Sequence, residues 1–157
     1  MKLRVVVSTL FLLAIAAACG PVASQGPSPT GSPSSSLSTE QAAFAPAGPT
    51  LGGQRAGDVL AWLASTPELP RQGDARIDAY VVGLDGRPMD DVSVVFDTDM
   101  TNMSHGKYLV VTEPAGNGHY AGQVHFLMPG PWRIIAAIER PGRDPLKLRF
   151  EFTVGTP

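Results

Sequence analysis

The sequence predicts an all-β domain, an antiparallel β-sandwich of six or seven strands. Apolar and polar residues alternate in several short stretches, most cleanly in LKLRFEFTV at residues 146–154, which is the pattern of strands with one buried face. Turn signals rich in Pro and Gly separate these stretches at a spacing of roughly ten residues. No segment carries a convincing helical period. These features are typical of an immunoglobulin-like sandwich, and a small barrel is the alternative that they leave open.

The first 18 residues have the composition of a lipoprotein signal peptide. Lys2 and Arg4 precede the run VVVSTLFLLAIAAAC, whose apolar part of about 14 residues is too short to cross a membrane as a helix. Alanines stand directly before Cys19 and a glycine follows it, as in the cleavage box of bacterial lipoproteins. We therefore expect Cys19 to be the lipidated N-terminus, which anchors an extracytoplasmic protein to the cell membrane. An ordinary secretory signal with an incidental cysteine is the alternative.

Residues 19–50 are expected to form a disordered linker. After Cys19 they consist largely of Pro, Ser, Gly and Thr, and no charged residue occurs between Arg4 and Glu40. A segment of this composition cannot offset its ordering entropy by burial. The folded domain is therefore expected over residues 51–157, tethered by the linker to the lipid on Cys19.

The strands of this domain follow from alternation and turn chemistry. The run VLAWLAS at 59–65 is expected to be a strand, although periodicity alone leaves a short helical turn open. Asp97 and Asp99 are expected to end one later strand, and PAGNG at 114–118 is expected to be a turn. Besides 59–65, strands are expected from 75 to the turn at 85–86 and over 92–96, 107–113, 119–127, 132–139 and 146–154.

Odd and even positions of a strand point to opposite faces of the sheet, so the sequence also predicts which side chains point inward. Trp132 shares parity with Ile134 and Ile138, so it is expected to face inward and to anchor the core. In the 119–127 strand, Tyr120 and the apolar residues of the same parity face inward. The histidines of that strand, His119 and His125, then fall on the outward face.

Two segments carry a more specific pattern. One is DMTNMSHG at 99–106, with the spacing Met-x-x-Met-x-His, and the other is GHYAGQVHFLMPGPW at 118–132. Together with TPELPRQGD at 66–74 and DGRPMDD at 85–91, they resemble the YtkA-like and FixH-like domains from residue 58 to residue 154. The resemblance implies an extracytoplasmic immunoglobulin-like domain associated with copper handling or cytochrome oxidase assembly. FixH proteins carry a transmembrane helix, whereas this chain is expected to use a lipid anchor.

Thioether and imidazole side chains gather in these two segments. Sulfur and imidazole donors suit Cu(I), a soft ion of low charge. Met100, Met103 and His105 fall in one predicted loop that can fold around a metal ion. His119 and His125 lie six residues apart on one strand, about 20 Å, so at most one of them joins a given site. The candidate copper ligands are Met100, Met103, His105, His125 and Met128.

Packing is an alternative explanation for part of this set. By parity Met100 continues the inward face of one strand and Met128 that of another, so both can cap the core. The outward histidines can be ordinary solvated residues, which leaves Met103 and His105 as the least explicable by packing. The chain is therefore expected to bind copper and to act with a membrane copper protein or an oxidase. A non-metal module for protein–protein interaction in the cell envelope is the alternative.

Charge and motif content argue against other classes of function. Removal of the signal peptide changes the net charge from −2 to −4, because 10 basic residues then face 14 acidic ones. Without a basic cluster, no nucleic-acid partner is expected. Ser104 and His105 are adjacent and point apart in an extended chain, and no GxSxG motif accompanies them, so we do not expect an enzyme. The acidic pairs at 90–91 and 97/99 lack the spaced oxygen ligands of a calcium loop.

Overall fold

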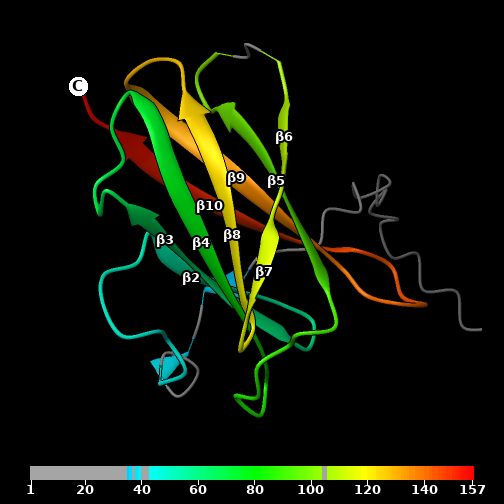
Figure 1. The fold of residues 1–157 in the computed structure, drawn as a ribbon. Helices are drawn as coiled ribbons and strands as arrows, with labels where there is room; N and C mark the ends of the chain where they lie inside the picture. The colour runs from blue at the N-terminus through cyan, green and yellow to red at the C-terminus, as the bar shows by residue number, and fades with distance from the viewer. Residues whose placement is uncertain (1–34, 37, 40–42, 104–105) are drawn as a thin grey trace, which may run out of the picture. The chain divides into compact units, whose positions relative to one another are not determined.

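The computed structural model describes residues 35–36, 38–39, 43–103 and 106–157. The predicted signal peptide, Cys19, most of the predicted linker and His105 lie outside these residues. The described chain consists mainly of strands, which form two antiparallel sheets (Figure 1). Among the residues described, no helix has the length and apolarity needed to cross a membrane.

The larger sheet contains six strands in the order β1-β2-β3-β4-β8-β7. All of its neighbouring pairs are antiparallel. Figure 1 shows β4 and β8 side by side in this sheet, with β7 beyond β8. The bounds are Ser35–Ser36 (β1), Gly52–Ala56 (β2), Val59–Thr66 (β3), Gly73–Gly83 (β4), Glu113–Gly116 (β7) and His119–Phe126 (β8).

The smaller sheet contains four strands in the order β10-β9-β5-β6, again all antiparallel. In Figure 1, β9 and β10 pass behind β4 and β8, so the two sheets form the layers of a sandwich. The bounds are Ser93–Met100 (β5), Tyr108–Val111 (β6), Gly130–Glu139 (β9) and Leu146–Val154 (β10). The predicted immunoglobulin-like β-sandwich is thereby confirmed.

The core lies between the two sheets, because alternate residues of their strands point into the same space. The ring of Phe126 in β8 meets the edge of Trp132 in β9, with centroids 5.1 Å apart, and that of Phe152 in β10 at 5.8 Å. Burial of each large apolar side chain contributes about 1.5–3 kcal/mol. The largest fully buried residues of this core include Ile77, Tyr120, Phe96, Phe126, Trp132, Ile134, Ile138, Leu148 and Phe150.

Four strands, predicted to begin at residues 75, 119, 132 and 146, are confirmed as β4, β8, β9 and β10. The run at residues 59–65 is strand β3. The prediction that Asp97 and Asp99 end a strand is wrong, because β5 continues to Met100. Asp99 stays inside the strand because its carboxylate contacts Arg133 of β9, with an N–O distance of 3.1 Å. This partner compensates the cost of burying a charge.

Three further differences between the predicted and the observed strands concern the edges of the sheets. The described residues contain ten strands rather than six or seven, partly because β1 and β2 were not predicted. The first of these, Ser35–Ser36, pairs with β2 from within the predicted linker range. Residues 114–116, expected to be part of a turn, belong to strand β7, and the turn itself is confined to 117–118. Pro114 fits there because β7 is an edge strand, and its missing N–H is not required by a second neighbour.

The stretch predicted as one strand over 107–113 divides between the two sheets. β6 pairs with β5, whereas β7 pairs with β8 in the other sheet. Thr112 lies buried at the crossing, where its N–H and its hydroxyl both donate to the Val94 carbonyl, at 3.2 and 2.8 Å. One edge of each sheet is therefore formed by a single extended segment, which Figure 1 shows running from β6 into β7.

Replacing Trp132 by alanine tests its predicted role in the core. The side chain is 2% exposed, so Trp132→Ala is expected to lower the free energy of unfolding by about 3–5 kcal/mol. Urea denaturation followed by circular dichroism measures the change. Leu69→Ala, at a side chain 73% exposed, is the control and should change stability by no more than about 0.5 kcal/mol. Equal stability of the two variants would contradict the placement of Trp132.

Candidate metal centre

Three connections meet at one end of the sandwich, which we call the methionine end. They are residues 101–103 after β5, residues 127–129 between β8 and β9, and residues 70–72 before β4. They come together because β5 ends where β9 begins, with Met100 opposite Trp132. Similarly, β4 begins where β8 ends, with Gly73 opposite Phe126.

Hydrogen bonds connect these segments to one another. The N–H of Thr101 donates to the Pro131 carbonyl at 3.0 Å, which ties the start of the loop carrying Met103 to the start of β9. The Nε2 group of Gln72 donates to the Leu127 carbonyl at 3.0 Å. One main-chain hydrogen bond thus ties the loop after β5 to the start of β9, and one side-chain hydrogen bond ties Gln72 to the loop that carries Met128.

Met100 is the last residue of β5 and lies buried in the core cluster. A Cβ atom at residue 130 would stand 3.0 Å from the Met100 methyl carbon, and Gly130 has a φ of +134°. Glycine is suited to this backbone conformation and to the close approach. The thioether of Met100 is therefore packed beneath the methionine end. This is the role in the core that strand parity offered as the alternative to copper binding.

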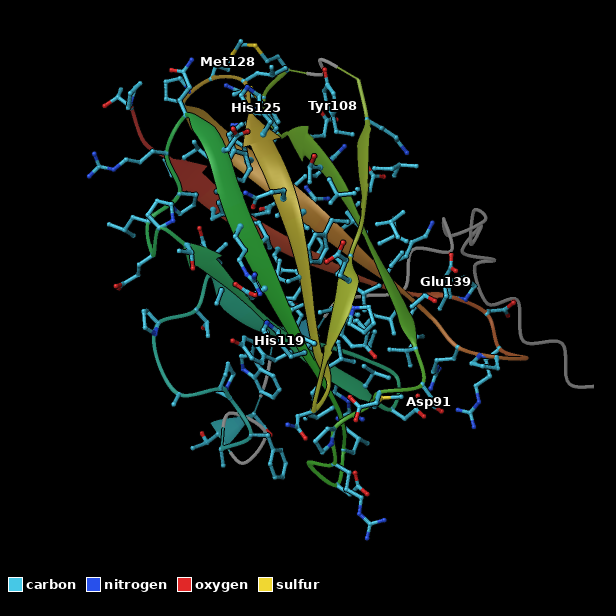
Figure 2. The ribbon with its side chains drawn as sticks, viewed as in Figure 1. Asp91, Tyr108, His119, His125, Met128 and Glu139 are labelled. Carbon is cyan, nitrogen blue, oxygen red and sulfur yellow. The ribbon has the colours of Figure 1, made fainter. Side chains whose placement is uncertain are left out.

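Met128 occupies an intermediate position. It is partly buried and packs against the core cluster, and its carbonyl accepts a hydrogen bond from Nε1 of Trp132 at 3.0 Å. Figure 2 shows Met128 and His125 at the same end of the sandwich. The core tryptophan thus fixes the main chain at the residue that carries this sulfur.

His125 lies on the outer face of β8, directly opposite Asp74 of β4. Its Nδ1 atom is 2.6 Å from Oδ1 of Asp74, and its side chain is 58% exposed. A carboxylate at Nδ1 favours the tautomer in which Nδ1 carries the proton and Nε2 keeps its lone pair. The pair therefore presents Nε2 of His125 to solvent as a metal donor.

Met103 lies exposed in the loop between β5 and β6. His105, two residues further along, is outside the described residues, so its position relative to Met103 is not part of the geometry. Among the residues that the structure describes, no three His, Cys, Asp or Glu side chains form a group that could hold a metal.

His119 lies at the opposite end of β8 from His125 (Figure 2), as their separation in sequence predicted. Its Nε2 atom is 2.7 Å from Oδ1 of buried Asp78, and its ring stacks on Tyr80 with centroids 4.7 Å apart. Asp78 also accepts a hydrogen bond from Nε of Arg76 at 2.9 Å. His119 is thus held by neighbours on its own sheet and does not reach the methionine end.

Three of the four acidic residues considered for calcium, Asp90, Asp97 and Asp99, have polar partners within the fold. Asp90 accepts a main-chain N–H at 2.6 Å, Asp97 lies 3.5 Å from a lysine, and Asp99 contacts the guanidinium described above. Near Asp90, the hydroxyl of Tyr120 donates to the Met89 carbonyl at 2.7 Å. Burial raises the pKa of the Tyr120 phenol, and the nearby carboxylates add to the rise. The contacts of Asp90 and Tyr120 thus connect the segment before β5 with residues 118–120.

Two contacts of the methionine end were not predicted from the sequence. Asp74 lies 51 positions from His125, and alternation places both on an outward face without revealing that they are opposite each other. The hydrogen bond from the Trp132 indole to Met128 spans only four residues. The MPGP turn before an inward tryptophan is the signal that could have indicated it.

The family model described as YtkA-like matches residues 54–137, more than half of the chain. The sequence has no significant match among curated proteins. FetP of uropathogenic Escherichia coli strain F11 superposes with a TM-score of 0.52 at 12% identity, covering 68% of this chain and 95% of FetP. A copper-bound variant of FetP gives the same TM-score and identity, with 68% and 96% covered. These similarities show a shared fold.

Chemical modification can test the different environments of the two β8 histidines. Diethylpyrocarbonate should modify His125 several-fold faster than His119, because the side chain of His119 is only 23% exposed and its Nε2 faces Asp78. Peptide mapping by mass spectrometry measures the two rates. Asp78→Ala should raise the rate at His119, and Asp74→Ala should leave that rate unchanged. Equal rates in the unmodified chain would contradict the described geometry.

Proposed function

The chain belongs to the YtkA-like family, and we propose that it binds one Cu(I) ion at the methionine end, outside the cytoplasm. In this proposal the ligands come from Met103, His105, His125 and Met128, and Met100 packs beneath them. The bound ion is passed to a membrane copper protein or an oxidase. The observation that carries the proposal is that His125 and Met128 lie at one end of the sandwich, beside the loop that contains Met103.

The chemistry of these donors supports copper over harder ions. Thioether sulfur binds soft Cu(I), and imidazole binds it as well, whereas Mg²⁺ and Ca²⁺ prefer oxygen donors. Asp74 supports the choice because it contacts Nδ1 of His125 at 2.6 Å. Metal-binding histidines commonly have such a carboxylate partner on the second ring nitrogen. Neutral ligands in an exposed position also suit a site that must release its ion to another protein.

The comparison with FetP supports the same proposal. A variant of FetP has been crystallised with copper bound, and this protein superposes on the present chain with a TM-score of 0.52. The identity of 12% carries no ligand from one chain to the other. The ligands proposed for this chain therefore rest on its own residues.

A second candidate function is an interaction module that binds no metal. The observation that favours it is the set of exposed apolar side chains on β6, Tyr108, Leu109 and Val111. Copper stoichiometry separates the two candidates, because an interaction module would purify without copper and would not take it up. Under either candidate we propose a binding role without catalysis.

Anaerobic competition titration with a chromophoric Cu(I) chelator tests the copper site. A soluble chain beginning at Gly20, which lacks the Cys19 thiol, is expected to bind one Cu(I) with a dissociation constant below about 1 μM. Asp74→Ala should weaken binding about tenfold through loss of the histidine partner. The double variant Met103→Leu/His105→Ala should weaken it more, because it removes donors directly.

Matched controls come from the other end of the domain. Met89→Leu and His119→Ala replace the same residue types away from the proposed ligands, and both should leave the affinity for Cu(I) unchanged. The proposal fails if the unmodified chain binds no more tightly than about 1 μM. It also fails if Met103→Leu/His105→Ala binds as tightly as the unmodified chain.

The proposed location outside the cytoplasm can be tested separately. We propose that Cys19 is cleaved and lipidated, because an apolar run preceded by Lys2 and Arg4 ends at it. In a bacterial host, globomycin should cause an uncleaved precursor to accumulate, and Cys19→Ser should move the protein from the membrane fraction to the soluble fraction. An unchanged mobility with globomycin, together with an unchanged distribution of Cys19→Ser, would contradict lipidation.

A further inference from the structure

β6 leaves one side of the smaller sheet unpaired. Among the strands of the described residues, the sheet order places β6 at the edge, with β5 as its neighbour. The opposite edge strand, β10, exposes Lys147, Arg149 and Glu151, and such charges discourage edge-to-edge pairing. β7, the edge of the larger sheet, carries Pro114 and a register shift, which act in the same way. β6, with the sequence YLVV, has none of these features.

The side chains of β6 are unusually exposed for apolar residues. Leu109 is 68% exposed and Val111 is 77% exposed. They have the same parity and so share one face of the strand, whereas Val110 packs against the core cluster. An apolar strand with unpaired main-chain groups on a free edge is a site at which a second strand can pair.

The main-chain groups of the same two residues are directed to the free edge. The N–H of Thr112 donates to the Val94 carbonyl in β5, so the groups of residue 112 point toward β5. In an antiparallel pair this direction alternates along the strand. The N–H and carbonyl groups of Leu109 and Val111 therefore point away from β5 and toward a further strand.

Opposite charges lie at equal distances from Val110, one just before β6 and one at the first residue of β7. Lys107 and Glu113 each lie three residues from Val110 and share the parity of Leu109 and Val111. Lys107 lies 3.5 Å from Asp97 of its own chain, an exposed contact of small energy. Within the described residues Glu113 has no ion-pair partner.

We propose that two copies of this chain pair antiparallel through β6, with Val110 of one copy opposite Val110 of the other. This register places Leu109 opposite the partner's Val111 and Lys107 opposite the partner's Glu113. Each of these pairs occurs twice, because an isologous interface is formed by the same surface patch on both copies, related by a twofold axis. The smaller sheets then form one continuous sheet, held by hydrogen bonds from Leu109 and Val111 and closed by an ion pair at each end.

The charge pattern favours a second copy as the occupant of this edge. In an antiparallel pairing with the twofold axis at Val110, Lys107 and Glu113 of one copy both face the opposite charge on the other copy. An unrelated strand could use the same main-chain groups, but it would have no reason to match both flanking charges. The pairing is independent of copper, since none of its contacts uses the ligands proposed above.

Exchanging the charges of Lys107 and Glu113 tests the proposed register between the two copies of β6. Sedimentation velocity over a range of concentrations, in the presence of a Cu(I) chelator, should show dimers of the chain that begins at Gly20. Lys107→Glu and Glu113→Lys should each weaken the dimer about tenfold, because each places like charges opposite one another twice. The double variant Lys107→Glu/Glu113→Lys should restore the dimer. Residues 107 and 113 are about 20 Å apart along the strand, so this rescue can only act between copies.

Further variants keep the result interpretable. Lys147→Glu changes an exposed lysine on the opposite edge strand and should leave the dimer unchanged. Leu109→Lys should abolish the dimer and leave thermal unfolding of the monomer unchanged, because the side chain is exposed. A monomer at all concentrations would overturn the proposal, as would a double variant no better associated than the single variants. Capture of a different protein by β6 in a chain that stays monomeric would also overturn it.

Discussion

The pairing of β5 with β9 is the constraint on which the rest of the domain depends. It places Met100 opposite Trp132 and Asp99 opposite Arg133, so one strand contributes both a core sulfur and a buried carboxylate. A slip of one residue would turn Trp132 out of the core and separate Asp99 from the guanidinium. The same register brings the loop after β5 against the start of β9, where Thr101 bonds to a carbonyl at 3.0 Å. The position of the methionine end is therefore a consequence of strand pairing.

A single strand, β8, contributes two histidines whose side chains differ in exposure and in hydrogen-bond partners. At one end His125 contacts Asp74 through Nδ1, and its side chain is 58% exposed. At the other end His119 is stacked on Tyr80 and bonded to buried Asp78. Both follow from the same outward parity, and the difference comes from the neighbouring strand β4. The residue that β4 places opposite each histidine decides whether its imidazole is open or enclosed.

The sequence allowed the strands to be predicted better than their partners, because alternation is local and register is not. The run at 146–154 alternates without interruption, and its strand was placed correctly, whereas GGQRA at 52–56 has no alternation and β2 was not predicted. An aspartate usually disfavours strands, so Asp99 is predicted to end one, whereas its ion pair with distant Arg133 keeps it inside β5. The pairing of Asp74 with His125 depends on the register of β4 with β8, which no local pattern encodes. His105 and Cys19 remain predictions, since both lie outside the described residues.

The hydrogen bond from the Trp132 indole to the Met128 carbonyl connects an aromatic chromophore to the loop proposed to hold copper. Indole emission responds to the polarity and hydrogen bonding of its surroundings, so the fluorescence of Trp132 reports on the state of that loop. Trp62 lies in a separate buried cluster with Leu60 and Val82 and provides an internal reference. The domain thus contains a natural optical sensor for events at one of its ends, and no label has to be attached to read it.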